Sequence, residues 1–103
     1  MSNVTSSKAD DAATPVPTAL ITRVGLSDYD VWRVGFDHFE DRRNAAGIRN
    51  PRIYRDVNDG NQVIVVFDIA DPDKARQFFA SGAVQQAMRE GGGVLAPPLL
   101  NFV

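Results

Sequence analysis

The sequence predicts an α+β domain in which helices cover one face of a four-stranded antiparallel sheet. Segments with strand periodicity and segments with helix periodicity follow one another in the order β-α-β-β-α-β. A tight-turn sequence between the two middle strands makes them antiparallel neighbours. The expected strands are residues 18–25, 49–58, 62–70 and 94–103, and the expected helices are residues 27–46, 72–80 and 83–90.

The first strand and the first helix are identified by the spacing of their apolar residues. Residues 18–25 alternate between apolar and polar side chains and end at Gly25. The helix over 27–46 has Ser27 or Asp28 as its N-cap, because such side chains accept hydrogen bonds from free amide groups. One apolar stripe with i, i+3, i+7, i+10 spacing consists of Tyr29, Trp32, Phe36 and Phe39.

The second half of the chain carries clear turn and cap signals. Pro51 confines its strand to an edge or a strand start. The turn 58–61, Asn-Asp-Gly-Asn, leads into the most apolar strand. Asp71 followed by Pro72 is a helix start, with proline at the first helical position. The Ser-Gly pair at 81–82 interrupts that helix, and three glycines end the second part. The last strand follows, and its start is expected to be irregular at Pro97-Pro98.

The domain organisation is a leader followed by one small domain. Residues 1–17 consist mainly of Ser, Thr, Ala, Asp and Pro, so we expect a flexible N-terminal leader. Residues 18–103 form the domain. A domain of this size is near the lower limit for independent folding, and association with a second copy would relieve that.

Composition excludes several classes of function. The absence of cysteine excludes disulfide scaffolds, thiolate catalysis and iron–sulfur clusters, and one histidine excludes sites with several imidazoles. A net charge of −2 argues against general nucleic-acid binding. No apolar run approaches the roughly 20 residues of a membrane span, and the N-terminus has no secretory signal. We therefore expect a cytoplasmic protein without nucleic-acid or membrane partners.

The strand 62–70 is apolar on both faces, with Asp68 as its one charge. The first face carries Val63, Val65, Phe67 and Ile69, and the second carries Ile64, Val66 and Ala70. A sheet covered on one face only should alternate between apolar and polar residues. The sequence therefore predicts a homodimer through sheet-to-sheet packing, and the alternative is a monomer with both faces partly buried.

Several motifs together resemble a known group of proteins. They are the hairpin 56–61 leading into 63–67, the Asp71-Pro72 helix start, and the broken helix 78–88 followed by glycines. With these motifs, residues 18–103 resemble the dimeric α+β barrel superfamily, whose best-known branch is the antibiotic biosynthesis monooxygenases. The resemblance implies a ferredoxin-like protomer whose sheet packs on that of a second copy. The superfamily includes cofactor-free oxygenases, haem-degrading enzymes, polyketide cyclases and isomerases, so it indicates fold more than function.

His38 is the candidate catalytic residue, because it is the side chain that titrates near neutral pH. It could act as a general base toward a pocket between helix and sheet; the alternative is a half-exposed surface histidine. A third possibility is a metal site with Asp37 and Asp41. Haem-degrading relatives place their histidine on the second helix, where this chain has none. We therefore predict no cofactor and no metal.

Aromatic residues and one arginine are the candidate ligand-binding residues. They are Trp32, Phe36, Phe67, Tyr54 and Arg55. They could line a pocket for a flat apolar molecule; the alternative is ordinary core. Arg55 belongs to a cluster with Arg42, Arg43, Arg49 and Arg52, which could bind an anionic group or form a solvated surface.

Two functions remain open from the sequence. The first is a small homodimer that binds a small apolar or aromatic molecule, with cofactor-free monooxygenation or polyketide cyclisation as the chemistry. The second is a non-catalytic homodimeric interaction or structural module. A closed cavity of roughly 300 Å³ or more beside His38 would favour the first, and a helix packed tightly onto the sheet there would favour the second.

Overall fold

The computed structural model describes residues 18–103, and the leader expected at 1–17 lies outside this part of the chain. The strands are β2 (Thr18–Gly25), β3 (Ile48–Arg55), β4 (Gln62–Ile69) and β5 (Leu99–Phe102). The helices are α2 (Tyr29–His38), α3 (Glu40–Ala45), α4 (Pro72–Ala80) and α5 (Gly82–Arg89). No helix formed by residues 18–103 is long and apolar enough to cross a membrane.

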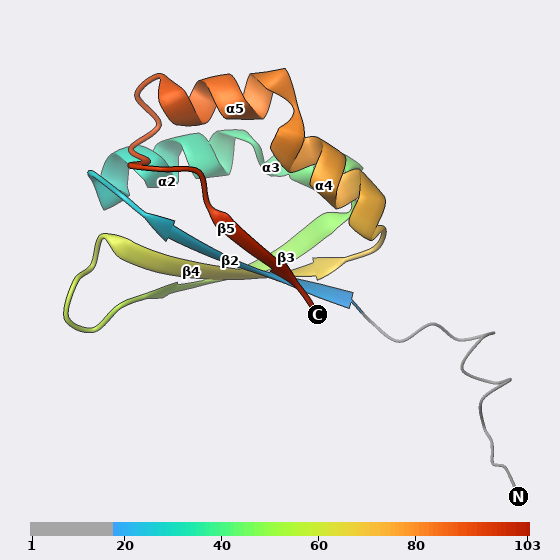
Figure 1. Cartoon of the computed structure of the whole chain (residues 1–103), viewed down its shortest axis with the longest axis horizontal. Helices are drawn as coiled ribbons and strands as arrows, with labels where there is room; N and C mark the ends of the chain where they lie inside the picture. The colour runs from blue at the N-terminus through green and yellow to red at the C-terminus, as the bar shows by residue number, and fades with distance from the viewer. Residues whose placement is uncertain (1–17) are drawn as a thin grey trace, which may run out of the picture.

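The strands form one antiparallel sheet in the order β3-β4-β2-β5 (Figure 1). This order, with the chain order β-α-β-β-α-β, is the ferredoxin-like arrangement. The predicted α+β class is therefore confirmed. The helices lie together on one side of the sheet, α2 and α3 beside α4 and α5 (Figure 1).

The expected helix 27–46 is two helices in the structure. Asp28 is the N-cap, and its carboxylate accepts hydrogen bonds from the amides of Asp30 and Val31. The helix breaks at Phe39, whose φ of −90° and ψ of 6° lie outside the helical range. The second expected cap is also present, because the Asp71 carboxylate accepts from the first amides of α4.

The last strand is shorter than expected. Regular pairing covers Leu99–Phe102 only, and the segment before it forms one isolated bridge between Val94 and Leu26. Pro97 and Pro98 lack the amide hydrogens that a ladder needs, so pairing begins after them.

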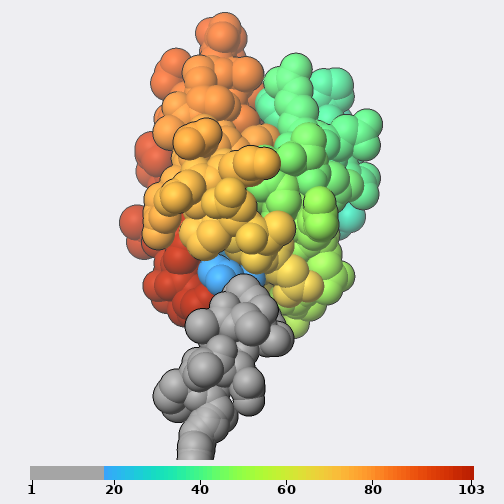
Figure 2. Space-filling model, turned by 90° about the vertical axis from the view of Figure 1, so that its right-hand side faces the viewer, coloured from blue at the N-terminus to red at the C-terminus, as the bar shows by residue number. Residues whose placement is uncertain are grey.

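The core lies between the sheet and the helices. Val63, Val65, Phe67 and Ile69 of β4 are buried there, so the helices cover the first of the two apolar faces of this strand. Aromatic side chains also join the helices, since Phe39 and Phe78 meet edge to face with ring centroids 6.4 Å apart. Figure 2 shows the side chains of α4 and α5 (yellow to orange) against those of α3 and β3 (green).

The opposite face of the sheet carries apolar side chains and, among residues 18–103, no covering helix. The register pairs Ile21 with Val66 and Tyr54 with Ile64, which places these four side chains on this face. Tyr54 is 57% exposed and Leu99, at the end of β5, is 71% exposed. We call these five residues the open-face patch.

The turn from α3 into β3 depends on Gly47. This glycine has a φ of +74°, in the left-handed region that side chains disfavour. A Cβ at this position would also lie 2.9 Å from the Cβ of Ala70. The close approach of the turn to the end of β4 therefore requires glycine.

Candidate functional site

A cavity of about 110 Å³ lies between the helices and the buried face of the sheet and is partly open to the surface. The helices α2, α4 and α5 and the strands β2 and β4 contribute mainly apolar residues, and α3 contributes Arg43. The lining consists of Thr22, Val24, Trp32, Gly35, Phe36, Phe39, Arg43, Val65, Phe67, Phe78, Phe79, Val84, Ala87, Met88, Gly92, Val94 and Pro98.

Aromatic rings form one wall of this cavity. Trp32 and Phe36 are one helical turn apart on α2, and their ring centroids lie 4.8 Å apart. The Phe36 ring stacks over Phe67 of β4 at 6.1 Å. Three of the five predicted ligand-binding residues therefore lie together at the cavity.

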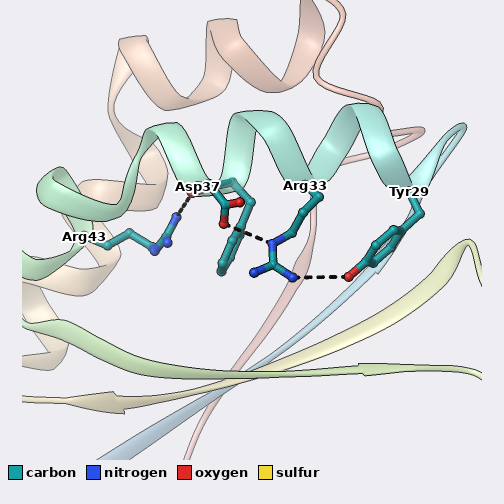
Figure 3. A network of polar contacts seen from close by, with 5 residues as sticks. Tyr29, Arg33, Asp37 and Arg43 are labelled. Atoms are coloured by element: carbon teal, nitrogen blue, oxygen red, sulfur yellow. Dashed lines mark hydrogen bonds and ion pairs between the residues drawn. The ribbon is translucent and has the colours of Figure 1, made fainter.

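Arg43 is the charged side chain of this lining, and among the lining residues of the described chain no other is charged. It is 5% exposed, and its guanidinium carbon lies 3.7 Å from the ring centroid of Phe36 and 6.0 Å from that of Phe67. Its Nη1 donates a hydrogen bond to the Phe36 carbonyl, and Figure 3 shows the side chain between helix and sheet.

Burial governs the electrostatics of Arg43. Desolvation lowers the pKa of its guanidinium, and the charges of Glu40 and Asp37 oppose that shift only partly. Within residues 18–103, no carboxylate lies within ion-pair distance of it. The pKa of an arginine starts so high that the group stays charged at neutral pH. The cavity thus contains a buried cation that has no carboxylate partner in the described part of the chain.

The sequence placed Arg43 in a positive cluster that could bind an anionic group or form a solvated surface, and it did not place Arg43 in the lining of this cavity. The signal was present, because the stripe that contains Phe36 and Phe39 reaches residue 43 at the next i+7 and i+4 positions. The break at Phe39 leaves this spacing in place, and so the arginine points to the core.

Tyr54 and Arg55, the other two predicted ligand-binding residues, lie away from this cavity. Both line a broad hollow of about 690 Å³ at the hairpin end of the sheet. The Arg55 guanidinium carbon lies 3.7 Å from the ring centroid of Tyr29, and its Nε donates to the Gly60 carbonyl at 2.9 Å. The structure therefore separates the five predicted residues into two groups.

His38 is exposed at the end of α2 and does not line either hollow. Its ring meets that of Phe39 edge to face, with centroids 5.9 Å apart. Among residues 18–103 no three metal-binding side chains are close enough to hold an ion, so the site with Asp37 and Asp41 has no support. The role of His38 as a base remains a prediction that this position does not favour.

A polar network runs along the exposed side of α2 (Figure 3). Arg33 Nε donates to the Asp37 carboxylate at 3.0 Å, and its Nη1 contacts the Tyr29 hydroxyl at 3.5 Å. These hydrogen bonds raise the pKa of Arg33. Exposed i, i+4 pairs of this kind add little stability. The network supports the helix and is not part of the cavity.

Comparisons of the sequence with known protein families and with curated proteins find no match. Solved structures do match. A Bordetella bronchiseptica protein, whose name assigns it provisionally to the antibiotic biosynthesis monooxygenases, is 15% identical with a TM-score of 0.67. The match covers 84% of this chain and 94% of that chain.

Two further structures are informative. A variant of SnoaB from Streptomyces nogalater, named as a cofactor-independent oxygenase, is 11% identical with a TM-score of 0.63 over 84% of this chain and 90% of that one. A dimeric ferredoxin-like protein from an uncultured marine organism is 10% identical with a TM-score of 0.51, covering 84% of each chain. The predicted resemblance is thus confirmed for the fold: the chain is a divergent example of the ferredoxin-like fold that antibiotic biosynthesis monooxygenase-like proteins share.

Proposed function

We propose that this protein is a homodimer that binds a small aromatic molecule in the cavity between helices and sheet. The observation that carries this proposal is the apolar cavity itself, with the rings of Trp32, Phe36 and Phe67 on its wall. Pockets of this kind, apolar with few polar groups, are the usual binding sites of small molecules.

The cavity volume limits the size of the ligand. A volume of about 110 Å³ is comparable with the engineered cavity of about 150 Å³ that binds benzene. It is below the roughly 300 Å³ at which pockets for drug-sized ligands begin. The cavity therefore favours a single-ring ligand over a polycyclic polyketide.

Catalysis is the second candidate function. SnoaB is named as a cofactor-independent oxygenase, and the present fold resembles it. Arg43 favours such chemistry, because a buried cation stabilises an anionic form of a bound molecule. A non-catalytic module is the competing possibility, because none of the lining residues of the described chain is an acid or base that titrates near neutral pH.

The dimer is proposed to form through the open-face patch. Ile21, Ile64 and Val66 are only half-buried in one chain, and Leu99 is largely exposed. A second copy would cover this apolar face, as exposed apolar patches of this kind commonly mark interfaces. One structural neighbour is named as dimeric. An obligate interface should bury about 2,000 Å² or more. A cytoplasmic location remains a prediction from the sequence.

Thermal unfolding with a panel of single-ring compounds tests the ligand proposal. A ligand that binds the folded state raises the melting temperature. Ala87→Leu fills part of the cavity and should abolish that rise, whereas Ala83→Leu, at an exposed position of the same helix, should preserve it. A panel in which no compound stabilises the wild-type protein, or stabilises both variants equally, would contradict the proposal.

A further inference from the structure

We propose that the ligand of this cavity carries an oxyanion, a carboxylate or a phenolate, which pairs with Arg43. The inference rests on the proposed function and adds the chemical class of the ligand, a small aromatic acid. It starts from the cation that the cavity contains, which an apolar ligand alone would leave unpaired.

Burial of an unpaired charge is unusual in folded proteins. Moving a cation out of water costs several kcal/mol unless a counter-ion compensates. Arg43 is 5% exposed, and among residues 18–103 its nearest acidic groups, Glu40 and Asp37, act only through space. Asp37 is already paired with Arg33. An anion from outside the described chain would supply the missing partner.

Most hydrogen-bond donors of Arg43 have no acceptor among the described residues. A guanidinium has five N–H groups. Nη1 donates a hydrogen bond to the Phe36 carbonyl, and the other donors have no partner among residues 18–103. The edge formed by Nε and Nη2 is the one that grips a carboxylate with two parallel bonds. A carboxylate would therefore satisfy both the N–H donors of Arg43 and its buried positive charge.

A structural role alone does not account for this arginine. The Phe36 carbonyl also accepts from the Phe39 amide at 3.3 Å, so the helix break has a backbone partner already. One donor would suffice for that carbonyl, and a neutral amide could provide it. The guanidinium carbon lies 3.7 Å from the centroid of the Phe36 ring, a cation–π contact that holds the group at the aromatic wall without using its N–H donors.

The cation and the rings form one site of suitable size. Arg43 lies within 6.0 Å of the Phe67 ring, and Trp32 is next to Phe36. A planar ring against this wall can thus place a substituent at the guanidinium. The arrangement selects a molecule with one apolar ring and one anionic oxygen group.

Calorimetric titration of the full chain with matched compounds tests the inference. The probes are benzoate, its neutral counterpart benzamide, toluene, and 4-nitrophenol above and below its own pKa. We expect benzoate or nitrophenolate to bind at least about tenfold more tightly than the neutral compounds, the scale of one charged hydrogen bond. Whichever anion binds more tightly identifies carboxylate or phenolate as the preferred group.

Variants separate the charge from the fold. Arg43→Met should remove the preference for the anion and retain toluene binding, while Arg42→Met, at an exposed neighbouring arginine, should change neither. If Arg43→Met does not fold, the comparison of benzoate with benzamide on the wild-type protein still tests the inference. Equal binding of charged and neutral compounds by the wild type would overturn the inference and leave the proposed function standing. Binding of none would overturn the proposed function.

Discussion

Substituting Val66 by aspartate should dissociate the proposed homodimer while each chain stays folded. Val66 lies on the open face, half-buried beside Ile21 and Arg52 in the register of the sheet. Its neighbour Val65 points to the other face and is 1% exposed beneath the helices. Aspartates at these adjacent positions therefore test two different environments.

The magnitude follows from the burial of each position. Full burial of a valine stabilises by about 1.5–3 kcal/mol, so covering the smaller, exposed part of Val66 contributes less than about 1 kcal/mol. A carboxylate in the interface adds an uncompensated desolvation cost of several kcal/mol. Twofold symmetry counts each effect twice. A conservative loss of about 4 kcal/mol corresponds to a roughly thousandfold weaker dimer.

Sedimentation velocity and circular dichroism at micromolar concentration provide the assay. Val66→Asp should sediment as a monomer with a spectrum close to that of the wild type. Val65→Asp should lose its folded spectrum, because a charge in the core costs about 4 kcal/mol or more of a small total stability. A wild-type protein that sediments as a monomer, or a Val66→Asp protein that remains dimeric, would refute the reasoning.

Three further outcomes are expected. Gly47→Ala should lower the free energy of unfolding by about 1 kcal/mol or more in chemical denaturation, because its φ of +74° disfavours a side chain; unchanged stability would contradict this. Hydrogen bonds from Asn50 and Arg52 lower the pKa of Asp68, so its contribution to stability is present above about pH 4 and is lost as pH falls through the lowered pKa. The melting temperatures of wild type and Asp68→Asn should thus differ at neutral pH and converge in acid, and a constant difference would be evidence against it. His38→Ala should change stability by about 0.5 kcal/mol or less and leave ligand affinity unchanged, since the side chain is exposed and outside the cavity; lost affinity would restore its predicted role.

Local sequence signals predicted most of the fold. Asp28 and Asp71 start helices as expected, because a cap depends on nearby residues only. The period of two along β4 separated the residues of its two faces, but because both faces are apolar it did not show which one the helices cover. The break at Phe39 was missed, since an unbroken apolar stripe does not reveal where one carbonyl takes a side-chain donor. The irregular start of the last strand at Pro97-Pro98 was predicted, but regular pairing is confined to Leu99–Phe102 and so is shorter than the predicted 94–103.

The site was predicted less completely than the fold. Trp32, Phe36 and Phe67 meet at the cavity because all three side chains point to the core. The helical spacing of the first two and the strand position of the third predicted this. Tyr54 lies on the other face of the sheet, which depends on the register across the bulge between Arg49 and Arg52. Whether a charged side chain is buried depends on packing between distant segments, so the sequence did not distinguish Arg43 from its exposed neighbours.

The fluorescence of Trp32 tests the central claim, ligand binding in the cavity, most directly. The chain has one tryptophan, and that residue lines the cavity at 9% exposure, so its emission reports on this site. We predict that a single-ring ligand changes the emission in a saturable manner, with the affinity found by calorimetry, and that Ala87→Leu abolishes the change. Constant Trp32 emission at ligand concentrations that saturate the calorimetric signal would place the binding elsewhere and contradict the account.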